Sequence, residues 1–205
     1  SGESSPSREV RAMQSCRRRH SFIARSGAGD LFRRLACAVL AAVATGGTVA
    51  RAGELDARLA PLAPYVDRTF TASMGPAGNE GAAVDIQKWE TVLGGKAVRI
   101  THSINGGDYG GESLVTWDAS TGSIRYWYVT TAGFHTVGTM TAAGDSLVTL
   151  EDVVGDAGGI TKVEGVWRRT AEGLTVSSRM QAAGQWQPKR ETAYRETPGA
   201  EPRFR

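Results

Sequence analysis

Residues 97–104 read Ala-Val-Arg-Ile-Thr-His-Ser-Ile, and side chains of mostly apolar character occupy every second position. The positions that share this face are Val98, Ile100, His102 and Ile104. A period of two is typical of a β-strand with one buried face. The stretch therefore predicts a strand that carries His102 on its apolar face.

The same alternation recurs along the chain, and short turn signals rich in Gly, Asp and Asn interrupt it at regular intervals, for example at 105–108 and 118–122. Strands joined by such turns form antiparallel hairpins. We expect nine strands, near residues 69–73, 84–93, 97–104, 112–118, 123–130, 135–141, 146–153, 160–169 and 174–182, and a tenth near 185–194.

The expected architecture is all-β. No stretch of helical period follows the first strands to provide the crossover that parallel strands need. An open sheet of this size would expose two long edges, whereas closure into a barrel removes them. Short hairpins favour an antiparallel up-and-down β-barrel of about 9–10 strands, with a two-sheet sandwich as the alternative. The spacing of Leu55, Leu59, Leu62 and Val66 predicts a short helix ahead of the barrel.

The charge of the chain is unevenly distributed. Residues 1–52 hold nine of the 24 Lys and Arg residues and three of the 21 acidic residues, while the whole chain carries a net charge of +3. The remainder is therefore slightly acidic, and its charges are scattered. Because nucleic-acid binding needs basic side chains clustered on a folded face, we expect no nucleic-acid partner.

Residues 33–52 have the layout of a secretory signal peptide. Arg33 and Arg34 precede an apolar run at 35–44, and Ala50-Arg51-Ala52 places small residues before Gly53. A basic start, an apolar run of about ten residues and an Ala-x-Ala site are the parts of such a signal. The run is shorter than the roughly 20 apolar residues that span a membrane. We predict an exported protein, periplasmic or secreted, with no stable membrane span after cleavage near Gly53.

Both cysteines, Cys16 and Cys37, precede the predicted cleavage site. The mature chain would therefore hold neither a disulfide nor a thiolate metal ligand. We expect residues 1–52 to be a disordered extension plus signal peptide, and residues 53–205 to be a single barrel domain.

Two segments carry a family resemblance. The first reads Trp89-Glu90-x-x-Leu93-Gly94-Gly95-Lys96-x-Val98, and the second reads Val115-Thr116-Trp117-Asp118-x-x-Thr121-Gly122-x-Ile124-x-x-Trp127. Both are similar to segments of bacterial lipocalin-like (calycin-type) barrel domains of unknown function, and the similarity extends over about residues 55–196. These are turn and packing residues, so the resemblance implies a fold and no particular activity.

Related barrels include small haem-binding proteins that hold iron through a histidine near the last strand. This chain has no histidine from Thr136 to Arg205. The resemblance therefore does not extend to haem ligation, and we expect no cofactor.

The candidate site residues are those that we expect to face the barrel interior. His102 is either a core histidine with a hydrogen-bond partner or a polar anchor in an otherwise apolar cavity. His135, the other histidine after residue 52, is expected at the rim. Two histidines without His-x-His spacing fall short of the three or so ligands of a metal site, so we predict none. The predicted ligand-binding residues are His102, Tyr126, Tyr128 and Trp117.

The leading functional hypothesis is a barrel that binds a small apolar ligand in its interior. One alternative is a small enzyme of the isomerase, cyclase or hydrolase type, with His102 as the acid–base group and a tyrosine as its partner. The other is a structural or interaction module with a filled barrel. An empty cavity would exclude the filled barrel, and a polar cluster around His102 would favour the enzyme. The sequence predicts neither the ligand nor an oligomeric state.

Overall fold

A computed structural model describes residues 53–75 and 82–205. The predicted signal peptide, the extension before it and both cysteines lie outside the described residues. None of the helices in the described part is long and apolar enough to cross a membrane.

The described residues form an all-β structure that begins with one short helical segment. This 3₁₀ helix, η2, spans Ala57–Leu62, and a second 3₁₀ turn, η3 (Leu93–Gly95), joins two strands. Each of the nine predicted strands is present, and β3, β5 and β8 have the predicted bounds. The strands are β1 (Arg68–Ser73), β2 (Val84–Val92), β3 (Ala97–Ile104), β4 (Tyr109–Asp118), β5 (Ser123–Thr130), β6 (His135–Ala143), β7 (Ser146–Val154), β8 (Ile160–Arg169), β9 (Gly173–Ala182), β10 (Gln185–Trp186) and β11 (Arg190–Glu196).

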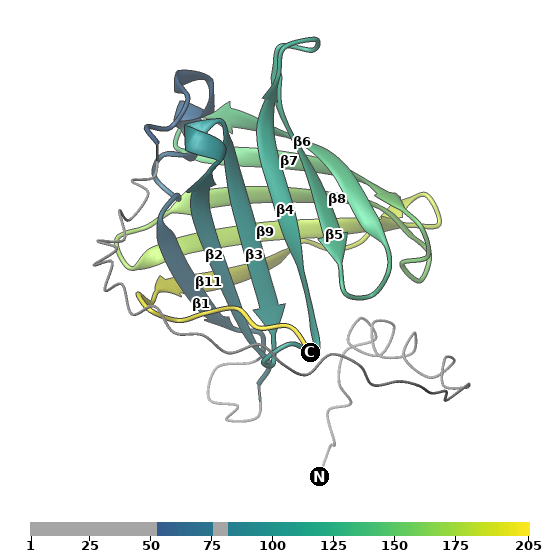
Figure 1. Cartoon of the computed structure of the whole chain (residues 1–205). Helices are drawn as coiled ribbons and strands as arrows, with labels where there is room; N and C mark the ends of the chain where they lie inside the picture. The colour runs from purple at the N-terminus through teal and green to yellow at the C-terminus, as the bar shows by residue number, and fades with distance from the viewer. Residues whose placement is uncertain (1–52, 76–81) are drawn as a thin grey trace, which may run out of the picture.

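The sheet closes on itself (Figure 1). Consecutive strands pair antiparallel from β1 to β9, and β11 pairs with both β9 and β1. Within the described part of the chain, ten strands thus form an up-and-down barrel, which confirms the predicted architecture and excludes the sandwich. Strands β2 to β4 at the front of Figure 1 cross β9 behind them, so the strands are strongly tilted.

The last barrel strand is interrupted near Pro188. β10 pairs with β9 at Trp186 and Gln181, and β11 resumes this pairing at Arg190 and Ser178. Proline has no amide hydrogen to contribute to the ladder. β10 and β11 together correspond to the tenth predicted strand.

Inward-facing positions line up around the barrel. In β3, Val98 and Ile100 are buried, while Arg99 between them is half-exposed. The register sets Ile100 between Trp89 on β2 and Ser113 on β4, both of which are buried. Since a slip of one residue would turn every side chain to the other face, this register fixes which residues enclose the interior.

A helical segment covers one end of the barrel. Asp56 caps η2 by accepting a hydrogen bond from the backbone N–H of Arg58 at 3.0 Å. Leu59 and Leu62 on η2 are fully buried. Burial of two leucines stabilises the fold by about 3–6 kcal/mol relative to exposed side chains.

Three aromatic side chains pack beneath η2, and together with Leu59 and Leu62 they form a plug at this end of the barrel. Tyr65 stacks on Trp89 with ring centroids 5.2 Å apart, and Trp89 meets Trp167 edge-on at 5.6 Å. The Tyr65 hydroxyl donates to the carbonyl oxygen of Trp167 at 3.0 Å. The plug fills the half of the barrel next to η2.

The C-terminal residues pack on the outer face of β2 and β3. The backbone N–H of Arg203 donates to Oγ of Ser103 at 2.9 Å, and Lys88 pairs with Glu201 at 2.8 Å. Gly107 has a φ of 108°, and a Cβ atom there would lie 2.9 Å from the carbonyl oxygen of Arg203. Only glycine allows this close approach.

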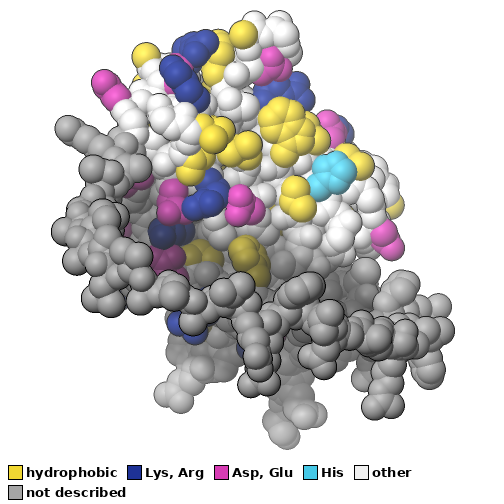
Figure 2. Space-filling view, viewed as in Figure 1, with side chains coloured by type: hydrophobic (Ala, Val, Ile, Leu, Met, Phe, Trp, Pro, Cys, Tyr) yellow, Lys and Arg dark blue, Asp and Glu magenta, His cyan; other side chains and the backbone are white. Residues whose placement is uncertain are grey.

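Elsewhere the outer face carries one notable group of apolar side chains. Figure 2 shows hydrophobic side chains gathered on the face that β4 and β5 present, near a histidine. Leu114 and Trp127 are cross-strand partners, and with Val129 they are among the exposed large hydrophobic residues.

Candidate functional site

A cavity of about 270 Å³ occupies the half of the barrel away from the plug. Trp167 contributes to its lining next to the plug, and Phe134 and Ala157 contribute from the β5–β6 and β7–β8 loops. Much of its wall is apolar, with contributions from Ile100, Met140, Val153, Ile160, Val163, Val176 and Met180. Ligand pockets are typically concave, mostly apolar and of about 300–1,000 Å³, so this cavity suits a small ligand.

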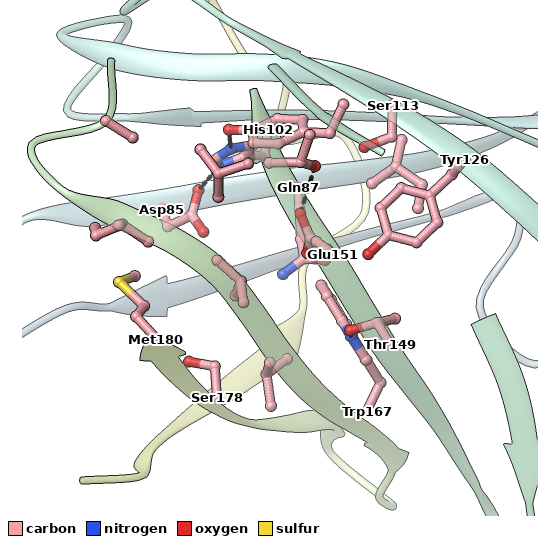
Figure 3. Close-up of a pocket in the computed structure, with 18 of the residues that line it drawn as sticks. Asp85, Gln87, His102, Ser113, Tyr126, Thr149, Glu151, Trp167, Ser178 and Met180 are labelled. Carbon is pink, nitrogen blue, oxygen red and sulfur yellow. Dashed lines mark hydrogen bonds and ion pairs between the residues drawn. The ribbon is translucent and has the colours of Figure 1, made fainter. Parts of the chain in front are cut away.

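His102 is held from both sides by cavity-lining residues. Its Nδ1 lies 3.0 Å from Oδ1 of Asp85 on β2 (Figure 3). Its Nε2 lies 2.5 Å from the Tyr128 hydroxyl on β5. The other oxygen of Asp85 accepts a hydrogen bond from the Tyr194 hydroxyl at 2.8 Å. Asp85 is only 4% exposed, and these two partners satisfy a carboxyl group that would otherwise be costly to bury.

The hydrogen bonds continue from Tyr128 to a second phenol. The Tyr128 hydroxyl donates to the Tyr109 hydroxyl at 3.1 Å. This makes a connected chain of polar groups along one wall, from Tyr194 to Tyr109.

Four phenols around the cavity are kept in their neutral form. Burial raises the pKa of Tyr109 to about 12, and it raises the pKa values of Tyr126, Tyr128 and Tyr194 as well. Each of these hydroxyls therefore remains a hydrogen-bond donor at ordinary pH.

A carboxyl group lines the cavity from β7. Oε2 of Glu151 accepts a hydrogen bond from the Thr136 hydroxyl at 2.5 Å. Burial raises the pKa of Glu151, and the hydrogen bond from Thr136 offsets part of this effect. The negative charge of an ionised Glu151 contributes to the raised pKa values of Tyr109 and Tyr128. Glu151 therefore interacts electrostatically with the hydrogen-bonded tyrosines next to His102.

Tyr126 is the exception among the cavity tyrosines. Its side chain is buried, and its hydroxyl has no hydrogen-bond partner among the described residues. In Figure 3 the hydroxyl points toward the space between Glu151 and Thr149. The Thr149 hydroxyl already accepts from Nε1 of Trp167 at 3.3 Å and donates to the carbonyl oxygen of Gly165 at 3.4 Å.

The structure brings three of the four predicted site residues together. His102, Tyr126 and Tyr128 line the cavity. Trp117 does not line it; it packs at the edge of the core, where the Arg58 guanidinium lies over its ring at 5.9 Å. His135 starts β6 and is also outside the cavity lining.

Sequence reasoning missed Asp85, Tyr109, Glu151 and Tyr194. Asp85 and Glu151 each occupy an inward position of a strand, two residues from Gln87 and Thr149 respectively. A carboxylate at an inward position of a period-two pattern was the signal that could have found both.

The positions of the potential metal ligands can be compared among the described residues. Within residues 53–75 and 82–205, no group of three or more His, Cys, Asp and Glu side chains is arranged to hold a metal ion. The ionisable groups of the cavity are instead arranged as hydrogen-bonding partners of one another.

Comparison of the sequence with models of known protein families and with curated proteins finds no match. The closed antiparallel barrel is consistent with a calycin-like fold. The cavity and the residues that line it therefore carry the argument about function.

Proposed function

We propose that this protein binds a small, largely apolar ligand inside the barrel. The observation that carries the proposal is the cavity of about 270 Å³ between the plug and the loops that follow β5 and β7. Protein interiors normally leave few voids larger than a water molecule. A barrel that served only as a structural module would have larger side chains in this half, as it has around Trp89 and Trp167 in the other half.

The arrangement of polar groups supports the same function. The cavity is apolar over most of its wall and contains a few fixed polar groups, His102 with Asp85 and Tyr128 on one side and Glu151 with Thr136 on another. Small-molecule sites use such a combination, in which apolar surface provides affinity and a few polar groups orient the ligand. This is also the internal binding mode expected of a lipocalin-like barrel, the family to which we assign the chain as part of the proposal.

We further propose that the protein acts after export, in the periplasm or outside the cell. The signal-peptide pattern at residues 33–52 supports this location. Just after the predicted cleavage site, the backbone N–H of Asp56 donates to the carbonyl oxygen of Gly95 at 2.9 Å, and a Cβ atom at Gly53 would lie 2.5 Å from Gly94. A chain that starts at Gly53 would keep all of these contacts.

Native mass spectrometry of the protein purified from its own cells tests ligand binding. Ser178 on β9 lines the cavity, and its neighbour Ser177 does not. We expect the wild-type protein and Ser177→Phe to carry the same additional mass, and Ser178→Phe to lack it because the new ring occupies the cavity. An unliganded wild-type protein, or equal retention by Ser178→Phe, would contradict the proposal.

One observation favours a second candidate function, acid–base catalysis. Asp85 orients His102, and His102 contacts the Tyr128 hydroxyl, which is the arrangement of an orienting carboxylate, an imidazole and a third group that exchanges a proton. If the site is catalytic, His102→Gln should accumulate substrate, so the molecules extracted from the variant and from the wild type should differ. Identical molecules from both proteins would contradict catalysis and leave ligand binding as the proposed function.

A further inference from the structure

The Tyr126 hydroxyl forms no hydrogen bond of good geometry among the described residues, although Glu151 and Thr149 lie close enough to influence its pKa. Tyr126 is 3% exposed, and its hydroxyl is buried without a hydrogen-bond partner among the described residues. The other cavity tyrosines are bonded: Tyr194 to Asp85, and Tyr128 to both His102 and Tyr109. Leaving a buried hydroxyl unpaired costs free energy, so an unpaired donor that faces a cavity calls for a function.

A buried carboxyl group lies beside it. Glu151 faces the same part of the cavity, and Tyr126 and Glu151 interact electrostatically. Burial raises the pKa of Glu151 and so favours the protonated carboxyl. Oε2 accepts from the Thr136 hydroxyl, so a protonated Glu151 would donate from its other oxygen.

We propose that Tyr126, with Glu151 beside it, binds a carbonyl oxygen of the ligand. A carbonyl oxygen accepts two hydrogen bonds and donates none, so it satisfies two donors at once. A ligand hydroxyl would bring a hydrogen that needs its own acceptor, and a ligand cation would meet donors only. A ligand carboxylate would place a buried negative charge next to Glu151.

The remainder of such a ligand would contact apolar side chains. Met140, Val163, Val176 and Met180 also line the cavity. The cavity volume of about 270 Å³ is below the usual range for larger ligands, which limits the ligand to a compact molecule. The ligand class is therefore a small apolar ketone, aldehyde or ester, an inference that rests on the proposed binding function.

A matched pair of probes tests the proposed carbonyl site. Acetophenone and α-methylstyrene have nearly the same shape, but the first has a carbonyl oxygen where the second has a methylene group. Binding of each to the full-length protein can be followed by the intrinsic tryptophan fluorescence, to which Trp167 in the cavity wall contributes. We expect the wild type to prefer acetophenone, and Tyr126→Phe to reduce this preference by roughly tenfold.

Tyr65→Phe is the control variant. It also removes one phenolic oxygen, but from the plug, where that hydroxyl binds the carbonyl oxygen of Trp167. It should keep the wild-type preference. Tyr126→Phe should fold at least as well as the wild type, which circular dichroism would verify, because it removes an oxygen that makes no hydrogen bond.

Each outcome has a distinct meaning. Loss of the preference in Tyr126→Phe and its retention in Tyr65→Phe would support the assignment. Equal binding of both probes by the wild type, or an unchanged preference in Tyr126→Phe, would overturn the carbonyl site and leave the binding function standing. Failure of the wild type to bind either probe would overturn both proposals.

Discussion

Tyr126 lies directly across from Gly138 in the β5–β6 pair, and a Cβ atom on Gly138 would be 2.5 Å from the Tyr126 ring. The ring can lie against the barrel wall only because Gly138 has no side chain. A Cβ atom on Gly111, which lies diagonally across from Tyr128, would be 2.4 Å from the Tyr128 ring. These glycines hold two large aromatic side chains against the wall and leave the centre of the barrel open.

Gly138→Ala should therefore disturb the site without straining the backbone, since Gly138 does not have a positive φ. The new methyl group would push the Tyr126 ring toward the cavity. We expect a loss of about 1–3 kcal/mol in the free energy of unfolding, measured by urea denaturation. The same substitution in a Tyr126→Leu background should cost less, and an equal cost in both backgrounds would show that the ring is not what Gly138 accommodates.

His102→Phe should destabilise the fold more than the sequence alone suggests. The alternating pattern indicates an inward ring that Phe could replace. In the structure, however, the substitution leaves the Asp85 carboxyl buried, and of its two hydrogen-bond partners among the described residues Tyr194 alone remains. Leaving a buried hydrogen-bonding group without one of its partners costs about 1–3 kcal/mol.

A double-mutant cycle with Asp85→Leu checks this explanation. If the cost of His102→Phe arises from the unpaired carboxyl group, the double variant should be more stable than the sum of the two single effects predicts. Strict additivity in denaturation experiments would refute the coupling between the two side chains.

The two carboxyl groups Glu151 and Glu164 should affect stability with opposite signs as pH changes. Burial raises the pKa of Glu151 above its ordinary value of 4.5. Between that value and the raised one, the folded protein binds more protons than the unfolded chain, so this group's contribution to stability falls as pH rises. Glu151→Gln should remove this dependence and become more stable relative to wild type as pH rises above about 4.5.

Glu164 provides the matched comparison. A hydrogen bond from Arg179 lowers the pKa of Glu164, so its contribution is present above 4.5 and is lost as pH falls through the lower, folded-state value. Glu164→Gln should be less stable than wild type at neutral pH and equal to it in acid. Thermal unfolding measured across pH checks both assignments. They would be contradicted if, as pH rises, the unfolding temperatures of the two variants relative to wild type changed in the same direction.

Much of the fold could be predicted from the sequence, because strand position depends on local alternation and turn residues. The bounds of β3, β5 and β8 follow from patterns within each strand. The same local pattern places His102 on an inward face, since inward and outward positions alternate strictly along a strand.

The depth of each residue along the barrel could not be predicted in this way. Trp117 and Tyr126 both lie among apolar residues on neighbouring strands, but Trp117 is at the plug end and Tyr126 is at the cavity. Which end η2 covers depends on contacts between Tyr65, Trp89 and Trp167, which are far apart in the sequence. The partners of His102 were missed for the same reason: Asp85 and Tyr128 reach it across different strands.

The predicted start of the mature chain has its own test. N-terminal sequencing of protein recovered after export should begin at or within a few residues of Gly53, because Ala50-Arg51-Ala52 ends the signal-peptide pattern. Exported protein that retains residues 31–52 would contradict the predicted cleavage.

The methionine methyl groups allow the most direct measurement of ligand binding inside the barrel. The chain has four methionines, of which Met140 and Met180 line the cavity, Met74 is exposed outside the cavity lining, and Met13 lies outside the described residues. In protein labelled with ¹³C at the methionine methyls, we expect acetophenone to shift the NMR signals of Met140 and Met180 and to show intermolecular NOEs to them, while Met74 is unaffected. Shifts confined to Met74, or the absence of any shift at a saturating concentration of the probe, would contradict the account that the barrel interior is the binding site.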